Sequence, residues 1–309
     1  MEADWPLIAV RFVLDVVLSG LFGLSAFSLY GLKAGERADA LALRPWLVGS
    51  GLLGLLFSGI SLALLAAAMG GVPPWPVDRE AIGMLLSGSA TGTAWEARIA
   101  ALVVALIAAI VAAGRAALLG LVALAAAVAL ATLAWTGHGA MDEAAVGWVH
   151  LSADILHLLA GGAWAGALLG LILLVARPVG RIDAAYLALT HRALQGFGLA
   201  GTILVGTIVV TGIVNAWLLV GPANVPNLGA TLYGKLLIAK LALFGAMLGL
   251  ASLNRFHFTP AFKRLIAAAD HRGALSALRG SLAVEAACAI MVLALVAWFG
   301  TLEPPASAM

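Results

Sequence analysis

Residues 148–176 read WVHLSADILHLLAGGAWAGALLGLILLVA, and this stretch decides the fold class. A helix needs roughly 20 predominantly apolar residues to cross the hydrocarbon core of a bilayer. The stretch exceeds that length and carries one carboxylate and no Lys or Arg. Since lipid cannot satisfy free backbone groups, the segment is predicted to be a transmembrane helix.

The rest of the chain has the same character. Of its 309 residues, 63% are hydrophobic and 10% are charged, whereas a soluble domain is about half apolar and about a quarter charged. These values exclude a soluble enzyme, a nucleic-acid-binding domain and a disordered chain. A single cysteine, Cys288, excludes a disulfide framework. No phosphate-binding loop is recognisable, so we expect no nucleotide partner.

We therefore predict an all-α polytopic membrane protein that forms a single membrane domain over residues 1–309. The N-terminus lacks a basic region and a cleavage site, and we expect it to be retained. Eight segments meet the length and hydropathy criteria, and the lipid bilayer is their expected surroundings. They are 5–30, 46–70, 94–113, 117–135, 148–176, 196–220, 231–252 and 281–302.

The Lys and Arg residues of the predicted loops are distributed very unevenly. Twelve follow the odd-numbered spans, whereas Arg79 alone lies in the loops on the other side. Lys and Arg are concentrated on the cytoplasmic side of membrane proteins. We therefore expect both termini to be periplasmic if the chain lies in a bacterial inner membrane. The twelve are Lys33, Arg37, Arg44, Arg115, Arg177, Arg181, Arg192, Arg255, Lys263, Arg264, Arg272 and Arg279.

The two four-helix halves, about 1–136 and 137–309, resemble each other. Similar residues recur in the same order, and an even number of spans in each half predicts a parallel repeat. The alternative is a chance match between Gly- and Ala-rich helices. If the repeat is real, Asp15 and His157 are equivalent and face each other across the axis. The other matched positions are Ser58 with Thr211, Gly92 with Gly234, Arg98 with Lys240, and Trp135 with Trp298.

Three ionisable residues of the fifth span form one narrow stripe. His150, Asp154 and His157 fall at about 0°, 40° and −20° around a helix, and Trp164 continues the stripe toward the membrane interior. The preceding loop contributes His138 and Met141. Imidazole and carboxylate suit a divalent transition metal, and a thioether suits Cu(I). The candidate metal ligands are His138, His150, Asp154 and His157, and Met141 and Trp164 are additional candidates for a path or for support of the site.

The pattern leaves the use of these residues open. The two histidines of the fifth span either form successive stations on a path or each join ligands from another helix. Asp154 either binds a metal or orients a histidine. The alternative is a polar cluster that only bonds neighbouring helices.

Other polar residues inside the spans are weaker candidates. Asp15 either supports the metal site or pairs with Arg11 one turn away. A deeply placed Lys240 is expected to need a carboxylate or carbonyl partner, and Asn215 is expected to bond between helices. Three residues of the last span are a candidate exit for a soft cation, with packing as the alternative: Glu285, Cys288 and Met291.

Several segments together resemble the CopD-type copper-resistance membrane proteins. The stretch from His157 through Trp164 to Gly166 is similar to an H-x6-W-x-G motif of that family. Residues 211–216, 231–240 and 253–260 resemble its core, as does the last span from Ser281 to Pro305. The resemblance covers nearly the whole chain and is strongest over 138–305.

The resemblance implies an inner-membrane protein that moves copper from periplasm to cytoplasm. It also implies a separate periplasmic copper-binding partner of the CopC type, because this chain carries no fused partner domain. The histidines that the family is suspected to use correspond here to His138, His150 and His157.

The sequence is compatible with three functions. The first is copper transport without covalent chemistry, so that the chain is not an enzyme. The second is a membrane haem protein or quinone-linked oxidoreductase; two histidines on one helix cannot flank one haem, but a single-ligand site stays open. The third is a factor that passes copper to a partner without transporting it.

Overall fold

The computed structural model describes residues 4–37, 39–112, 114–137, 144–177, 183–267 and 271–308. Within them, eight helices are long and apolar enough to cross a membrane, which confirms the predicted all-α polytopic fold. The helices are α1 (Trp5–Gly31), α2 (Leu43–Gly70), α3 (Arg79–Gly88), α4 (Ala90–Val111), α5 (Ala116–Ala131), α6 (Ala144–Val175), α7 (Ala184–Leu219), α8 (Leu232–Leu253), α9 (Thr259–Ala267) and α10 (His271–Phe299). Short helical turns are η1 (Thr132–Thr136), η4 (Pro222–Ala230), η5 (Asn254–Phe258) and η6 (Pro305–Ala308).

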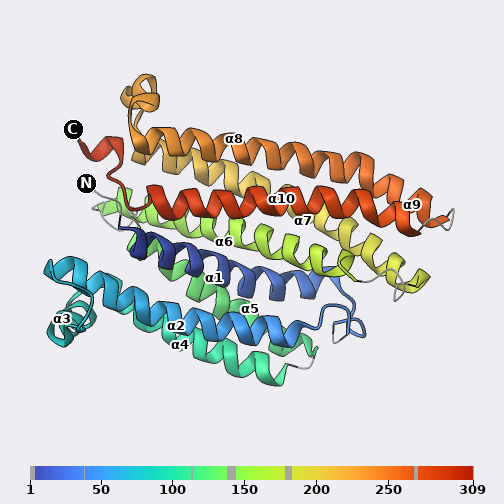
Figure 1. The fold of residues 1–309 in the computed structure, drawn as a ribbon, viewed down its shortest axis with the longest axis horizontal. Helices are drawn as coiled ribbons and strands as arrows, with labels where there is room; N and C mark the ends of the chain where they lie inside the picture. Colours follow the sequence, from blue (N-terminus) through green and yellow to red (C-terminus); the bar gives the residue numbers. More distant parts are fainter. Residues whose placement is uncertain are drawn as a thin grey trace.

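The long helices run side by side, and both chain ends lie at the same end of the bundle (Figure 1). We call this end the termini face and the opposite end the far face. The short helix α3 and the turn η4 also lie at the termini face, whereas α9 lies at the far face. An even number of spans requires the two chain ends to share one face.

Several helices differ from their predicted bounds. Helix α7 begins at Ala184 and α10 at His271, so both extend further toward the far face than the apolar segments do. A hydropathy criterion stops at polar residues, but a helix with polar residues continues where its side chains are solvated. The short helix α3 was not predicted; Asp78 caps it by accepting hydrogen bonds from Glu80 and Ala81.

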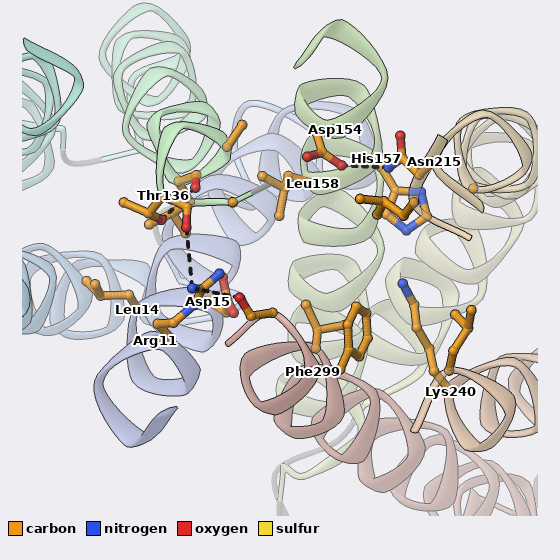
Figure 2. Close-up of a pocket in the computed structure, with 18 of the residues that line it drawn as sticks. Arg11, Leu14, Asp15, Thr136, Asp154, His157, Leu158, Asn215, Lys240 and Phe299 are labelled. Atoms are coloured by element: carbon orange, nitrogen blue, oxygen red, sulfur yellow. Dashed lines mark hydrogen bonds between the residues drawn. The ribbon is translucent and has the colours of Figure 1, made fainter. Parts of the chain in front are cut away.

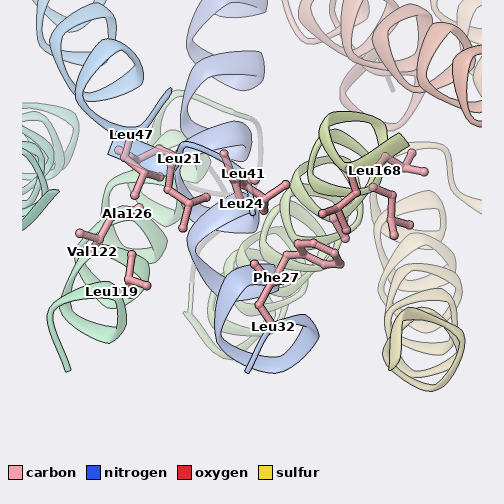
Figure 3. Close-up of a cluster of buried hydrophobic side chains, with 14 of the residues drawn as sticks. Leu21, Leu24, Phe27, Leu32, Leu41, Leu47, Leu119, Val122, Ala126 and Leu168 are labelled. Atoms are coloured by element: carbon pink, nitrogen blue, oxygen red, sulfur yellow. The ribbon is translucent and has the colours of Figure 1, made fainter. Parts of the chain in front are cut away.

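Helices α1 and α6 form the centre of the bundle and cross very closely. A Cβ atom added to Gly23 would lie 2.3 Å from the Gly162 carbonyl oxygen, and one on Gly166 would lie 2.3 Å from the Gly23 backbone. Small residues allow such close backbone approach in membrane helices. Buried leucines and Phe27 pack around this crossing (Figure 3).

Each half of the chain forms its own helical group around this centre. Helix α1 packs against α2 and α5, and α6 packs against α7 and α10. The groups differ in how closely two of their helices pack. Helix α2 packs along α4 in the first half, whereas an apolar cavity of about 370 Å³ lies between α7 and α8 in the second. This cavity runs along the helices of the second half, and exposed side chains such as Ile213 and Leu241 form part of its lining.

Candidate functional site

A cavity of about 160 Å³ lies near the termini face and receives residues from both halves. Figure 2 shows its lining, to which α1, α6, α7 and α8 contribute polar side chains. Ionisable groups are rare inside membrane helices and mark functional sites by default. The described ionisable lining residues, apart from Tyr233, are Arg11, Asp15, Arg98, Asp154, His157 and Lys240.

Helix α6 directs Asp154 and His157 into this cavity, and α7 holds both side chains. The Nδ2 of Asn215 donates to Oδ1 of Asp154 at 2.6 Å, which confirms that Asn215 bonds between helices. His157 Nδ1 lies 2.9 Å from Thr211 Oγ1. Thr211 already donates its hydroxyl proton to the Thr207 carbonyl at 2.6 Å.

The Thr211 hydroxyl therefore accepts a hydrogen bond from His157, because it has only one proton to donate. This assigns the Nδ1–H tautomer to His157 and leaves the Nε2 lone pair available. A neutral imidazole with one nitrogen fixed by a hydrogen bond is the usual form of a metal-binding histidine.

Lys240 enters the same cavity from α8. Its side chain extends toward the His157 ring (Figure 2), and its ammonium lies 5.3 Å from the centre of the Phe299 ring. It also attracts Asp154 electrostatically. Asp154 is thus a carboxylate within electrostatic range of Lys240, but the described residues show no salt bridge between the two, and a direct partner for Lys240 stays a prediction. A lysine beside a candidate metal ligand offsets part of the carboxylate charge while no metal is bound.

The first half contributes Arg11, Asp15 and Arg98. Arg11 donates to the carbonyl oxygens of Thr136 at 3.4 Å and Gly300 at 3.2 Å, so it links α1 to the ends of two other spans. Arg98 is 1% exposed and donates to the Thr132 hydroxyl at 2.8 Å. Asp15 is also buried and lines the cavity with His157.

The predicted packing of the first and fifth spans is confirmed, because α1 and α6 cross at the centre of the bundle. Asp15 and His157 line one cavity from these two helices. Whether Asp15 supports a metal there stays a prediction.

The remaining candidate ligands are placed less favourably. His150 is 1% exposed and lies on α6, two turns nearer the termini face than His157, but it is not part of the cavity lining. Within the described ranges, no three His, Cys, Asp or Glu side chains are arranged to hold a metal ion. His138 and Met141 lie outside the described residues. The described part of the cavity therefore presents two candidate ligands, His157 and Asp154.

Two further cavities continue from this one toward the far face. The apolar cavity of about 370 Å³ shares His157 and Lys240 with the first and reaches Trp164. A third cavity, of about 220 Å³, shares Trp164 and contains Glu285 and Asn254. The three follow each other along α6 from the termini face toward the far face, and neighbouring cavities share wall residues.

The three candidate exit residues of the last span do not lie together in the structure. Glu285 is 1% exposed and accepts a hydrogen bond from Trp164 Nε1 at 3.1 Å. Cys288 packs at the edge of the apolar core. Met291 is 53% exposed and lines a surface groove with Trp5. Trp164 and Glu285 thus lie on the series of cavities, and Met291 lies away from it.

Three residues that contact or line the site were not predicted from the sequence to belong to it: Thr211, Arg98 and Tyr233. Each lies on a different helix from the stripe of α6, and helical periodicity relates residues of one helix only. The signal for Arg98 was its position six residues after Gly92, which matches Lys240 after Gly234.

Comparison with known proteins agrees with this architecture. Residues 1–148 match the model of the copper resistance protein D-like N-terminal domain, and residues 191–299 match the model of copper resistance protein D. Copper resistance protein D of Pseudomonas syringae pv. tomato is 45% identical over 300 residues, which cover 96% of each chain. The inner membrane protein YebZ of Escherichia coli (strain K12) is 27% identical over 175 residues, covering 56% of this chain and 55% of YebZ. No solved structure matches. With family models on both halves and such similarity along nearly its full length, the chain belongs to the copper resistance protein D family.

Proposed function

We propose that this protein carries copper ions through its second half, from the cavity at the termini face to the far face. The observation that carries this proposal is the series of three cavities, of which the first and second share His157 and the second and third share Trp164. Membership of the copper resistance protein D family supports a role in copper resistance or transport. Copper is the cargo, and the proposed transport involves no covalent chemistry.

His157 Nε2 and an Asp154 oxygen are the proposed ligands at the entrance to the path. The Thr211 hydroxyl keeps the histidine in the tautomer that binds metal, and Asn215 orients the carboxylate. Additional ligands come from His150 or from His138 in the preceding segment. Imidazole and carboxylate together suit a divalent transition metal better than a hard cation.

The uneven distribution of Lys and Arg supports a periplasmic termini face and transport inward. The entrance would then face the periplasm, where a separate carrier of the CopC type would deliver the ion. A factor that hands copper to a partner without transport would need only the entrance. The two further cavities beyond His157 favour transport.

The proposal also involves a duplicated architecture with halves of about 1–136 and 137–309. Matched residues support it, because Asp15 with Arg98 and His157 with Lys240 line one cavity. Matched capping supports it as well, since Ser89 caps α4 at Gly92 as Thr231 caps α8 at Gly234. Sites at the junction of repeats are typical of transporters.

Copper binding to the purified chain tests the entrance. We expect Thr211→Val to weaken copper binding by about 10- to 100-fold, because outer partners of metal-binding histidines have effects of that size. Thr211→Ser keeps the hydroxyl and is the matched control. A visible spectrum of the same sample distinguishes the haem alternative. Equal copper affinity in Thr211→Val and Thr211→Ser would contradict the assigned role of His157.

A further inference from the structure

The cavity nearest the far face contains a buried carboxylate that is not among the proposed copper ligands. Glu285 is 1% exposed, and its two oxygens accept hydrogen bonds from neutral donors. Trp164 Nε1 donates to Oε1 at 3.1 Å, and Asn254 Nδ2 donates to Oε2 at 3.0 Å. Among the described residues, no Lys, Arg or His forms an ion pair with Glu285. An ionised carboxylate in such surroundings is costly unless a cation joins it.

Asn254 presents a second unusual feature beside Glu285. Its side chain is 8% exposed, and no hydrogen-bond donor among the described residues reaches its Oδ1 atom. A buried acceptor without a donor requires an explanation. Rotating the amide by half a turn would point Oδ1 at Glu285, where it becomes an acceptor for a proton carried by the carboxyl group.

The backbone places Asn254 at an irregular point of its helix. Residues 254–258 form a π-helical turn that follows α8, and Thr259 Oγ1 donates to the Asn254 carbonyl at 2.8 Å. Such turns insert one extra residue into a helix and occur frequently at functional sites. Here the turn points the Asn254 side chain at α10 and its neighbour Arg255 at α7.

The groups around the cavity favour a hard ion. Arg255 is the other charged residue of the described lining; it donates to the Gly198 carbonyl at 3.0 Å and to Thr202 Oγ1 at 2.6 Å. The described lining residues of α6, α7, α8 and α9 carry no further charge. His191 of α7 and Lys263 of α9 share a neighbouring cavity with Arg255. The available ligand atoms are oxygens, which do not select copper over hard cations.

We propose that Glu285 is a proton-binding site, with Asn254 as the partner that changes its hydrogen bond when the proton arrives. A proton from water in the cavity binds Oε2, and the rotated Asn254 amide accepts it through Oδ1. Trp164 continues to donate to Oε1 and forms the wall shared with the apolar cavity. The inference rests on the proposed copper transport and adds that copper movement is coupled to proton exchange at the far face.

Infrared difference spectra of the purified full-length protein test proton binding directly. Lowering the pH should produce the carbonyl stretch of a protonated carboxylic acid. We expect Glu285→Gln to remove the component of this signal that comes from the buried carboxyl group. Glu303→Gln, which changes an exposed carboxylate near the C-terminus, should leave that component in place. Identical spectra for Glu285→Gln and wild type would overturn the proposal. Glu285→Gln conserves the shape of the side chain, and Asn254→Leu provides a second variant that should shift the pH at which the signal appears.

Copper flux into proteoliposomes tests the coupling. For one coupled proton, a gradient of one pH unit is worth about tenfold in the ratio of opposing fluxes. We expect Glu285→Gln to bind copper normally but to lose this dependence on the gradient. If copper flux through Glu285→Gln depends on the pH gradient as strongly as in wild type, proton coupling at Glu285 is wrong, and the proposal of copper transport is unaffected. A His157→Ala variant with normal flux would instead contradict the copper path, and the infrared result would still decide whether Glu285 binds a proton.

Discussion

His157 and Asp154 lie one turn apart on α6, and a polar side chain of α7 holds each of them. The Thr211 hydroxyl decides the tautomer of the histidine, and the Asn215 amide fixes the carboxylate. Both neighbours are uncharged, so they orient the candidate ligands without adding positive charge. The stripe of α6 was predictable from helical spacing. The partners on α7 were not, because the spacing of one helix does not show which residues of another helix it meets.

Asp15 and Arg11 allow a residue-level test of two roles. Arg11 already bonds to two carbonyl groups, so its main contribution is structural. We expect Arg11→Ala to lower the amount of folded protein in the membrane, whereas Asp15→Asn should impair copper handling at a normal protein level. The Arg11→Ala/Asp15→Asn double variant should not regain copper handling. Recovery of both protein level and copper handling in the double variant would show a structural ion pair instead. Immunoblots and copper uptake are the measurements.

At the scale of helices, the eight spans were predictable because each contains a long apolar segment. The ends of the helices were less predictable. Asp183 caps α7, and its first turns carry Tyr186 and Thr190. A hydropathy criterion reads these polar residues as a loop, although local hydrogen bonds stabilise the helix there. Packing partners were predictable only through the repeat, which indicated that the first and fifth spans meet.

The crossing of α1 and α6 gives a prediction about glycine. A methyl group on Gly23 or Gly166 would overlap the facing backbone. We expect Gly23→Ala and Gly166→Ala each to destabilise the folded protein by about 1–3 kcal/mol, the usual effect of overpacking. Gly161→Ala, also on α6, is the matched control, because no heavy atom lies within 4 Å of its added Cβ. Thermal melting in detergent is the measurement. Equal melting temperatures for Gly166→Ala and Gly161→Ala would disprove the close crossing.

At the far face, Glu36 joins the segment after α1 to α7 through an ion pair with Arg192. Burial tends to raise the pKa of Glu36, but the hydrogen bond from the Lys33 backbone N–H and the interactions with Arg192 lower the pKa below its ordinary value. The stabilisation is therefore present above the unfolded pKa and is lost as the pH falls through the folded pKa. We expect Glu36→Gln to cost at most about 1 kcal/mol at neutral pH. The difference from wild type should vanish in acid, as measured by chemical unfolding. A difference that grows in acid would refute the assignment.

On the scale of the whole molecule, the termini lie at the face that carries the entrance cavity. The Lys and Arg residues of the sequence predict which face is outside, whereas the helix packing alone gives no such prediction. We expect reporter enzymes fused after Met309 to be active in their periplasmic form and inactive in their cytoplasmic form. The opposite pattern would reverse the side of the entrance and the proposed direction of copper movement.

The family assignment and the cavities together make one claim central: copper crosses the membrane past His157. Uptake of radioactive copper by proteoliposomes that contain the full-length chain tests it most directly. The comparison uses equal amounts of wild type, His157→Ala and His191→Ala. His191→Ala is the matched control, because this histidine lies at the far face outside the series of three cavities. We predict that His157→Ala reduces uptake to the level of empty liposomes while His191→Ala transports normally. Uptake by His157→Ala at the wild-type rate would contradict the proposed path.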